Sequence, residues 1–581
     1  MESSQTLSPF EIESTRPLSG APASAGASSR HAASPNNVID AQKQICVSIA
    51  LLIRDSPPER SHLDAFMVLE RQAQQVGNRL LTQYVEGDAQ IRLMQWTAWQ
   101  SAYHLSRWLI QACQHFLPQI RTLAEEQWFE LEHGLLVKLF HHRKVEFLLR
   151  FLRYKRRSDD QWRQLHVQYR SARERDLRNT LEEMQQTEVG RDVVRRRAGP
   201  LEQQYLQILL LEAMNCGRFS PREALWAHRW FARWCSGSEL QLEHCDGSAA
   251  DAHKGFVVDL SGSEGLSRGP ATGPDFIHFD SSPLRALIEG EMTSLGDVAA
   301  LPLPVTPAVR AGQLALLRKL RILFAPHAME IARRTERHPV AMAVQTIAGF
   351  SGIVEALRKS GLRNYGSAAM SLPAGSVGTD ASISEAPSLL ITPADAEEGQ
   401  ADSALHDESD DIAQNWQVKD RSDSGCRMRG QIGDMNRVIP GSLIAIRDDS
   451  TSPWTVAVVR WFRRLMVDHV EIGVEYLGRS PRFVKMVAGG RMDFAVDEIL
   501  DSSSRCFAAL YLPPSDGHPT MPIKTLLLPA GEFKAGGEVM LLSSTATYRM
   551  RLNEPIQQQY EFVLTSFGVI GQPAPLAAAM Q

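Results

Sequence analysis

Two short groups of polar residues, far apart in the chain, carry side chains suited to holding an anionic, ring-containing ligand. Residues 333–337 read R-x-x-x-R, and residues 420–425 read D-x-S-x-x-G. The planar guanidinium of arginine matches phosphate oxygens or the O6/N7 edge of guanine, and it also stacks on a purine face. Aspartate and serine add an acceptor and a hydroxyl, and glycine permits a sharp turn or a close approach. Either group alone is ambiguous, because arginine pairs commonly form solvated surfaces and Asp-x-Ser commonly forms a turn.

The sequence around these groups predicts β-strands. Residues 340–350 can form a strand directly after the first group, and residues 412–418 can lead into the second, which would follow the strand. Three short runs come next, rich in β-branched and aromatic residues and separated by turn residues: 443–446, 454–461 and 470–477. This spacing is typical of a small antiparallel barrel.

Taken in this order, the two groups and the strands that follow them resemble the PilZ family of cyclic di-GMP receptors. The strand entry at Gly441, the strand ending Val459-Arg460-Trp461 and the Gly-Val-Glu-Tyr-Leu run of residues 473–477 are also similar to the barrel of that family. The resemblance covers roughly residues 331–487, which is about a quarter of the chain.

The resemblance implies a ligand and a set of residues that would hold it. Cyclic di-GMP carries two phosphodiester charges and two guanines, and the two motifs of the family clasp it. Carried over residue by residue, the ligand-binding positions are Arg333, Arg337, Asp420, Ser422 and Gly425. Arg334 is adjacent to the first of these and could replace Arg333 if the register differs by one residue.

The distance between the two motifs departs from the family pattern. Roughly eighty residues separate them, whereas family members usually have only a couple of strands there. Residues 366–411 are rich in Ser, Ala, Pro and Gly and then acidic, and no Lys or Arg occurs from Tyr365 to Val418. We expect a disordered insertion, because such a segment cannot bury enough apolar surface to offset its ordering entropy. Its acidic run is either a solvated spacer or a competitor for the arginines.

Composition limits the class of protein. A chain of 581 residues is too long for one hydrophobic core, and three or four domains are expected. The formal net charge of −5 gives no global basic field, so we do not expect nucleic acid as a partner. The longest apolar runs, such as residues 45–53, are too short to span a membrane, and no secretory signal is apparent. We therefore expect a cytoplasmic protein.

The cysteines indicate neither a disulfide framework nor a metal site. There are seven, without C-x-x-C spacing, as suits a reducing compartment. Cys235, His244 and Cys245 lie close together in the sequence, but a fourth ligand at a suitable spacing is missing. We interpret these three residues as packing or loop residues and expect no metal and no cofactor.

The predicted fold class is multidomain α + β, with an N-terminal all-α domain followed by a PilZ-like β-barrel and further β-rich regions. The predicted division of the chain is a disordered tail (1–37), a helical domain (38–236), a β-rich connector region (240–330), the PilZ-like barrel (331–487, with the insertion 366–411) and a C-terminal β-rich domain (488–572). The connector region has expected strands at 255–260 and 275–280 and could be a degenerate barrel ahead of the binding barrel, and residues 309–329 form either a helix or a connector that leads into Arg333. The C-terminal domain is either another small barrel or a sheet packed on the first.

Two features of the helical domain have alternative interpretations. The run from Leu225 to Trp234 places three tryptophans at helical spacing, which more often marks a core than a binding groove. Residues 150–157 are basic with aromatics between them, which is either a stripe for nucleic acid or, given the acids that follow, a solvated helical face. Ser220-Pro221-Arg222-Glu223 has the pattern of a helix start, and Asp259-Leu260-Ser261-Gly262 that of a turn.

Two functions compete on this evidence. The first is an effector that binds cyclic di-GMP and changes its domain arrangement, and so its interaction with an unidentified protein partner at the helical domain. The second is a scaffold whose PilZ-like barrel no longer binds nucleotide. An enzyme is not expected, because no phosphate loop, metal motif or nucleophile motif has supporting context.

Overall fold

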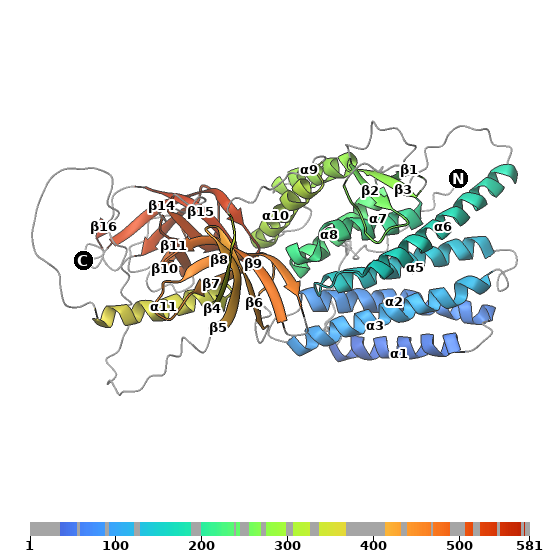
Figure 1. The fold of residues 1–581 in the computed structure, drawn as a ribbon, viewed down its shortest axis with the longest axis horizontal. Helices are drawn as coiled ribbons and strands as arrows, with labels where there is room; N and C mark the ends of the chain where they lie inside the picture. The colour runs from blue at the N-terminus through green and yellow to red at the C-terminus, as the bar shows by residue number, and fades with distance from the viewer. Residues whose placement is uncertain are drawn as a thin grey trace, which may run out of the picture.

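A computed structural model describes most of the chain. The described residues are 35–54, 59–86, 92–120, 128–186, 199–237, 240–244, 255–268, 273, 275–297, 306–325, 336–367, 413–431, 438–465, 469–488, 506–514, 523–542, 546–570 and 574–575. Arg333, Arg334, Cys245 and most of the insertion lie outside them. The predicted fold class is confirmed, with helices at one end of an elongated molecule and two β-barrels at the other (Figure 1).

Long helices form the N-terminal half. In chain order they are α1 (Pro35–Arg54), α2 (Arg60–Glu86), α3 (Arg92–Phe116), α5 (Trp128–Phe151), α6 (Asp159–Gln186), α7 (Pro200–Ala213) and α8 (Pro221–Gly237). Two short 3-10 helices, η1 (Leu117–Gln119) and η2 (Cys216–Arg218), follow α3 and α7. The helix start predicted at Ser220 is a capping box: the backbone N–H of Ser220 donates to Glu223 at 2.8 Å, and that of Glu223 donates to the Ser220 hydroxyl at 3.3 Å.

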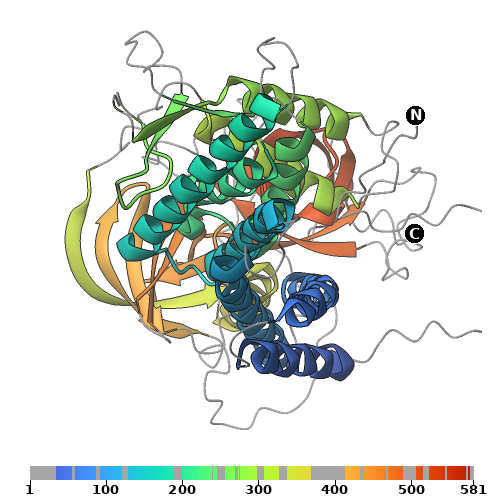
Figure 2. The ribbon, with the colours of Figure 1, turned by 90° about the vertical axis from the view of Figure 1, so that its right-hand side faces the viewer.

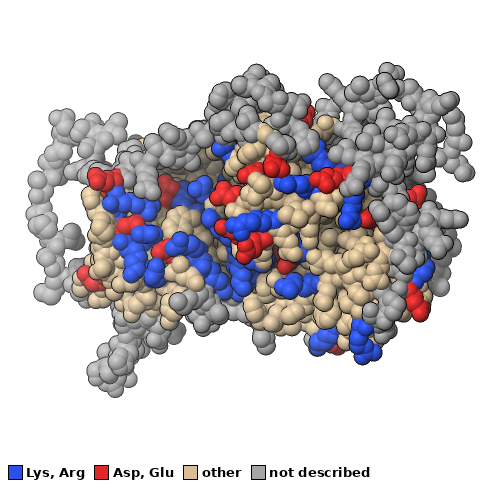
Figure 3. Space-filling view, turned by 45° about the vertical axis from the view of Figure 1, so that its right-hand side comes forward, with Lys and Arg blue, Asp and Glu red and all other residues tan. Residues whose placement is uncertain are grey.

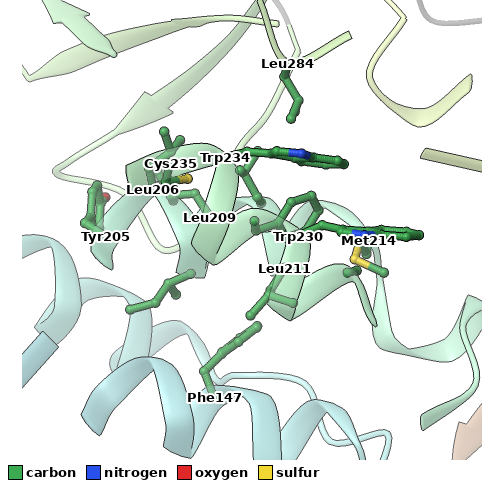
Figure 4. Packing of buried hydrophobic residues seen from close by; sticks show 14 of the residues in the cluster. Phe147, Tyr205, Leu206, Leu209, Leu211, Met214, Trp230, Trp234, Cys235 and Leu284 are labelled. Atoms are coloured by element: carbon green, nitrogen blue, oxygen red, sulfur yellow. The ribbon is translucent and has the colours of Figure 1, made fainter. Parts of the chain in front are cut away.

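The tryptophans of α8 belong to the core, as their spacing predicts. Trp230 and Trp234 stack with ring centroids 5.9 Å apart, and both are buried. Figure 4 shows them packed against leucines of α7, with Phe147 approaching from α5 and Leu284 from α9. The same hydrophobic cluster extends from Phe140 to Phe324, so the core of these helices continues into the connector region.

The connector region is a small sheet with two helices, and the interpretation of it as a degenerate barrel is wrong. The strands β1 (Leu242–His244), β2 (Gly255–Asp259) and β3 (Phe276–Asp280) pair in the order β1-β3-β2, and α9 (Ser282–Gly296) and α10 (Pro307–Leu323) follow. Three strands cannot close a barrel, and here their apolar face packs on helices. The predicted turn after β2 is present, since Asp259 accepts hydrogen bonds from the backbone N–H and hydroxyl of Ser261 at 2.8 and 2.6 Å.

Six antiparallel strands close the first barrel in the order β4-β5-β6-β9-β8-β7. They are β4 (His338–Ala348), β5 (Gln414–Ser422), β6 (Gly425–Gln431), β7 (Leu443–Arg447), β8 (Thr455–Arg464) and β9 (His469–Arg479). The strands predicted on either side of the motifs are confirmed, with one correction. The D-x-S-x-x-G group does not follow a strand, because Asp420 and Ser422 belong to β5 and Gly425 begins β6, joined by a two-residue turn.

A helix that the sequence did not suggest follows β4. This helix, α11 (Phe350–Ser367), begins where the first strand was expected to end and reaches the start of the predicted insertion. Ile353, Ala356 and Leu357 are buried in a cluster that also contains strands of both barrels. The helix therefore packs against strands of both barrels and connects them.

The C-terminal region is a second closed barrel with the topology of the first. Its strands are β10 (Arg482–Ala488), β11 (Cys506–Leu512), β12 (Thr525–Pro529), β13 (Glu538–Leu542), β14 (Ala546–Gln558) and β15 (Phe562–Val569), with η5 (Ala530–Glu532) after β12 and the short β16 (Ala574–Pro575) on β14. Because β13 pairs with both β10 and β14, the ring closes as β10-β11-β12-β15-β14-β13. Numbered within each barrel, both orders are 1-2-3-6-5-4. The alternative of an open packed sheet is therefore wrong.

Aromatic contacts join the helical half to both barrels. Tyr154, after α5, packs against the core of the first barrel, with its ring centroid 4.4 Å from that of Phe462 on β8. Tyr560 of the second barrel lies 6.4 Å from Trp226 of α8, and the guanidinium of Arg222 lies 4.0 Å above the Tyr560 ring. Figure 2 shows the long helices in front of the barrels. Among the described residues, no helix is both long enough and apolar enough to cross a membrane.

We predict that Gly425→Ala destabilises the first barrel. A Cβ added at Gly425 would lie 2.0 Å from the carbonyl oxygen of Val474, so β6 and β9 would have to separate. Overpacking of this kind lowers the free energy of unfolding by about 1–3 kcal/mol. Gly531→Ala is the matched control, because nothing lies within 4 Å of its added Cβ. Urea unfolding followed by tryptophan fluorescence measures the difference, and equal midpoints for the two variants would contradict the packing role.

Candidate functional site

The two sequence motifs meet at one end of the first barrel. Arg337 directly precedes β4, and the antiparallel pairing of β4 with β5 sets Pro339 opposite Asp420. Nη1 of Arg337 donates a hydrogen bond to Oδ1 of Asp420 at 2.9 Å, between residues 83 positions apart in the chain. The structure thus joins the described part of R-x-x-x-R to D-x-S-x-x-G in one contact.

A second arginine, Arg427 of β6, occupies the other oxygen of Asp420. Its Nε lies 2.6 Å from Oδ2, and the two residues are partners in the β5–β6 register. The Asp420 side chain is 14% exposed, against 35% for Arg337 and 39% for Arg427, so a largely buried carboxylate holds two more exposed guanidiniums. Arg427 was not singled out from the sequence. In the sequence, Arg427 could be recognised only by its position opposite Asp420 in the β5–β6 hairpin. A bulge between Val418 and Asp420 shifts the register of that pairing by one residue.

Ser422 and Gly425 shape the hairpin. The Ser422 hydroxyl donates to the carbonyl of Gly425 at 3.2 Å and lies 3.4 Å from the Ser424 hydroxyl. Gly425 allows β6 to run against β9 without a side chain between them. Both residues therefore have local roles in the absence of ligand, and the hydroxyl of Ser422 lies next to the Asp420 carboxylate along the same strand.

Arg421 fixes the strand that carries Asp420. Its guanidinium donates two hydrogen bonds to Asp448, at 2.9 and 3.0 Å, and a third from Nε to the Tyr476 hydroxyl at 3.0 Å. The hydrogen bonds that Arg421 donates to Asp448 hold the pKa of Arg421 above its ordinary value. Since side chains alternate along a strand, anchoring Arg421 to one side directs Asp420 to the other.

Charges of both signs cover the barrel around this site. Figure 3 shows basic side chains gathered over the barrel half and the middle of the face in view, with acidic side chains among them. Glu471 of β9, only 3% exposed, pairs with Arg463 at 2.8 Å and Arg429 at 3.5 Å. These two arginines share one buried carboxylate, so one positive charge remains there as well. At the motif end, Arg337 and Arg427 share one carboxylate, which leaves one excess positive charge for an anion.

The segment before Arg337 is anchored at its other end. Nη2 of Arg268 donates to the carbonyls of Leu323 and Ala325, at 2.8 and 2.7 Å, where α10 ends. Its guanidinium also lies 4.2 Å above the ring of Phe256, in the connector sheet. Residues 326–335, with Arg333 and Arg334, lie outside the described residues, so the structure places one arginine of the first motif.

Comparison with family models identifies two parts of the chain. Residues 30–244 match the model described as "Cyclic-di-GMP receptor FimW, N-terminal domain", and residues 376–482 match "Cyclic-di-GMP receptor FimW, middle PilZ domain". The second range contains D-x-S-x-x-G and five of the six strands of the first barrel, and it begins after β4 and the arginine motif. Neither the curated proteins nor the solved structures compared with the chain gave a match. The chain therefore belongs to the family of PilZ-domain cyclic-di-GMP receptors that these two models describe.

Proposed function

We propose that this protein is an effector that binds cyclic di-GMP at the motif end of its first barrel and transmits binding to its helical half. The observation that carries the proposal is the contact between Arg337 and Asp420, because it assembles the two motifs at one place. The proposed ligand-binding residues are Arg333, Arg334, Arg337, Asp420, Ser422 and Gly425, and Arg427 joins them as a further candidate.

Binding would exchange one set of ion pairs for another. A phosphodiester oxygen competes with Asp420 for Arg337, and the released carboxylate then accepts hydrogen bonds from the N1–H and N2–H₂ edge of guanine. Partly exposed ion pairs contribute only about 0.2–1 kcal/mol each to stability. Breaking the pair between Arg337 and Asp420 therefore costs less free energy than the new charge-assisted hydrogen bonds to the ligand contribute. Arg333 or Arg334 is available in sequence for the second phosphodiester.

The segment that joins the end of α10 to Arg337 supports a coupling between ligand binding and domain arrangement. Residues 326–336 run between the end of α10, which Arg268 holds to the connector sheet, and Arg337. A ligand that contacts arginines within this segment restricts its conformations. Coupling requires that two arrangements of the domains bind the ligand with different affinities.

A row of contacts across the barrel offers a second connection to the helices. Arg427 of β6 lies opposite Gly473 of β9, which lies opposite Trp461 of β8. A Cβ at Gly473 would lie 2.0 Å from Nε1 of Trp461, so the indole rests directly on the glycine. The next residue, Phe462, contacts Tyr154 of the helical half. A change at Arg427 therefore has a short path to Tyr154 in the helical half.

A scaffold without nucleotide binding is the second candidate. The observation that favours it is that Asp420 and Ser422 already have partners within the chain. In this case the pairs around Asp420 stabilise the barrel only, and the helical half binds its protein partner regardless of nucleotide.

Calorimetric titration of cyclic di-GMP into the full-length chain separates the two candidates. We expect a Kd in the micromolar range or below, corresponding to about −8 kcal/mol or more favourable. Arg337→Ala and Asp420→Ala should each weaken binding by roughly tenfold or more, which is about 1.4 kcal/mol, because each removes a direct ligand contact.

The control for this titration is Arg549→Ala, since Arg549 pairs with Glu538 in the second barrel. Its affinity should equal that of the wild-type chain. Absence of binding by folded wild-type protein would leave the scaffold as the function, and an equal loss in Arg549→Ala would show that the effect is not specific to the motif end.

Hydrogen–deuterium exchange measures the coupling. Cyclic di-GMP should slow exchange in residues 326–337 and change it around Tyr154, because both contact paths start at the ligand site. Tyr154→Ala should retain the first effect and lose the second, and Tyr154→Phe, which keeps the ring on Phe462, should behave as wild type. Slowed exchange in the barrel alone, with no change in the helical half, would contradict the coupling.

A further inference from the structure

A polar cavity lies in the helical half, lined by residues of α3, α5, α6 and the loop between α5 and α6. Its volume is about 440 Å³, within the range of roughly 300–1,000 Å³ that small-molecule sites occupy. Four arginines line it: Arg107 from α3, Arg143 and Arg150 from α5, and Arg157 from the loop that follows. Five glutamines complete most of the wall, including Gln168 of α6.

The lining carries excess positive charge. Glu146 is the one carboxylate among its residues, and it pairs with Arg143 at 3.3 Å. Arg150 donates from Nη2 to the carbonyl of Arg156 at 3.2 Å, which satisfies one donor and leaves its charge without a neutralising partner in the lining. Three positive charges remain in a concave site, and a concave site concentrates their field.

Several donors and acceptors of the lining are unused. Within the described part of the chain, Nε of Arg150, Nε of Arg157 and Oε1 of Gln168 are buried without a hydrogen-bond partner. Arg157 lies 5.1 Å from the ring of Phe147 and 5.3 Å from that of Trp162, which fixes its plane. Burial lowers the pKa of Arg157 to about 10, so it is still charged at neutral pH. Unmet donors on clustered charges are rare without a compensating ligand.

The chemistry of the lining favours a small phosphate over a protein segment. Only Ile110 and Leu165 are apolar, whereas protein docking sites depend on aromatic and apolar anchors. Arginine forks match phosphate oxygens, and glutamine amides both donate and accept, as a sugar or base requires. We infer that this cavity is a second anion site, separate from the barrel, that binds a phosphate-bearing molecule of nucleotide size. Two residues of the basic run 150–157, Arg150 and Arg157, then line a pocket for a small ligand.

The test is calorimetric titration of the full-length chain with two phosphate probes, inorganic pyrophosphate and GTP, and with a hexaglutamate peptide. Arg150→Gln and Arg107→Gln, which each remove one charge from the lining, should each weaken phosphate binding by about tenfold or more. Arg163→Gln is the matched control, because Arg163 lies on α6, is 53% exposed and pairs with Asp160 at 2.6 Å outside the cavity. Arg337→Ala reports binding at the barrel.

Each outcome has a definite meaning. Binding of both probes, reduced in Arg150→Gln and Arg107→Gln and retained in Arg163→Gln and Arg337→Ala, supports a phosphate site, and binding of GTP alone supports a phosphate ester. Loss of binding only in Arg337→Ala would place the anion at the barrel and overturn the inference. Equal binding of hexaglutamate would assign the cavity to an acidic protein segment, and absence of binding by either phosphate probe up to about 10 mM would also overturn it.

Discussion

The carboxylate of Asp420, held between Arg337 and Arg427, is the interaction on which the candidate site depends. Its two oxygens lie 2.9 Å from Nη1 of Arg337 and 2.6 Å from Nε of Arg427. The pairing of β4 with β5 brings the first arginine, the β5–β6 hairpin brings the second, and closure of the barrel fixes both strands. The anchoring of Arg421 on Asp448 and Tyr476 turns the carboxylate toward the site. A long intervening segment is tolerated because loop-closure entropy rises only slowly with length.

The arrangement of the rest of the molecule explains how such a site could affect distant surfaces. Two barrels of one topology share a hydrophobic cluster with α11, so they form a paired unit. Tyr154 reaches the core of the first barrel, and Tyr560 of the second contacts Trp226 and Arg222. The helical core continues into the connector sheet, and Arg268, which stacks on that sheet, holds the end of α10. Each contact is small, and together they oppose independent movement of the parts.

The sequence predicted the features that local patterns determine. Runs rich in β-branched and aromatic residues predicted five of the six strands of the first barrel, Ser220 with Glu223 predicted the start of α8, and the tryptophan spacing predicted its buried face. It could not supply features that depend on pairing across the chain. Arg427 becomes a candidate site residue only through strand register. The second barrel closes only because β13 pairs with β14, and the three connector strands pack on helices because their apolar face has that partner. The roles of Arg333 and Arg334 remain predictions.

The most direct measurement is a crystal structure of the full-length chain in complex with cyclic di-GMP. The account predicts that Nη1 of Arg337 leaves Oδ1 of Asp420, now 2.9 Å away, for a phosphodiester oxygen, and that the carboxylate accepts from a guanine edge. A complex in which the Arg337–Asp420 hydrogen bond persists at 2.9 Å, with the nucleotide bound elsewhere, would contradict it.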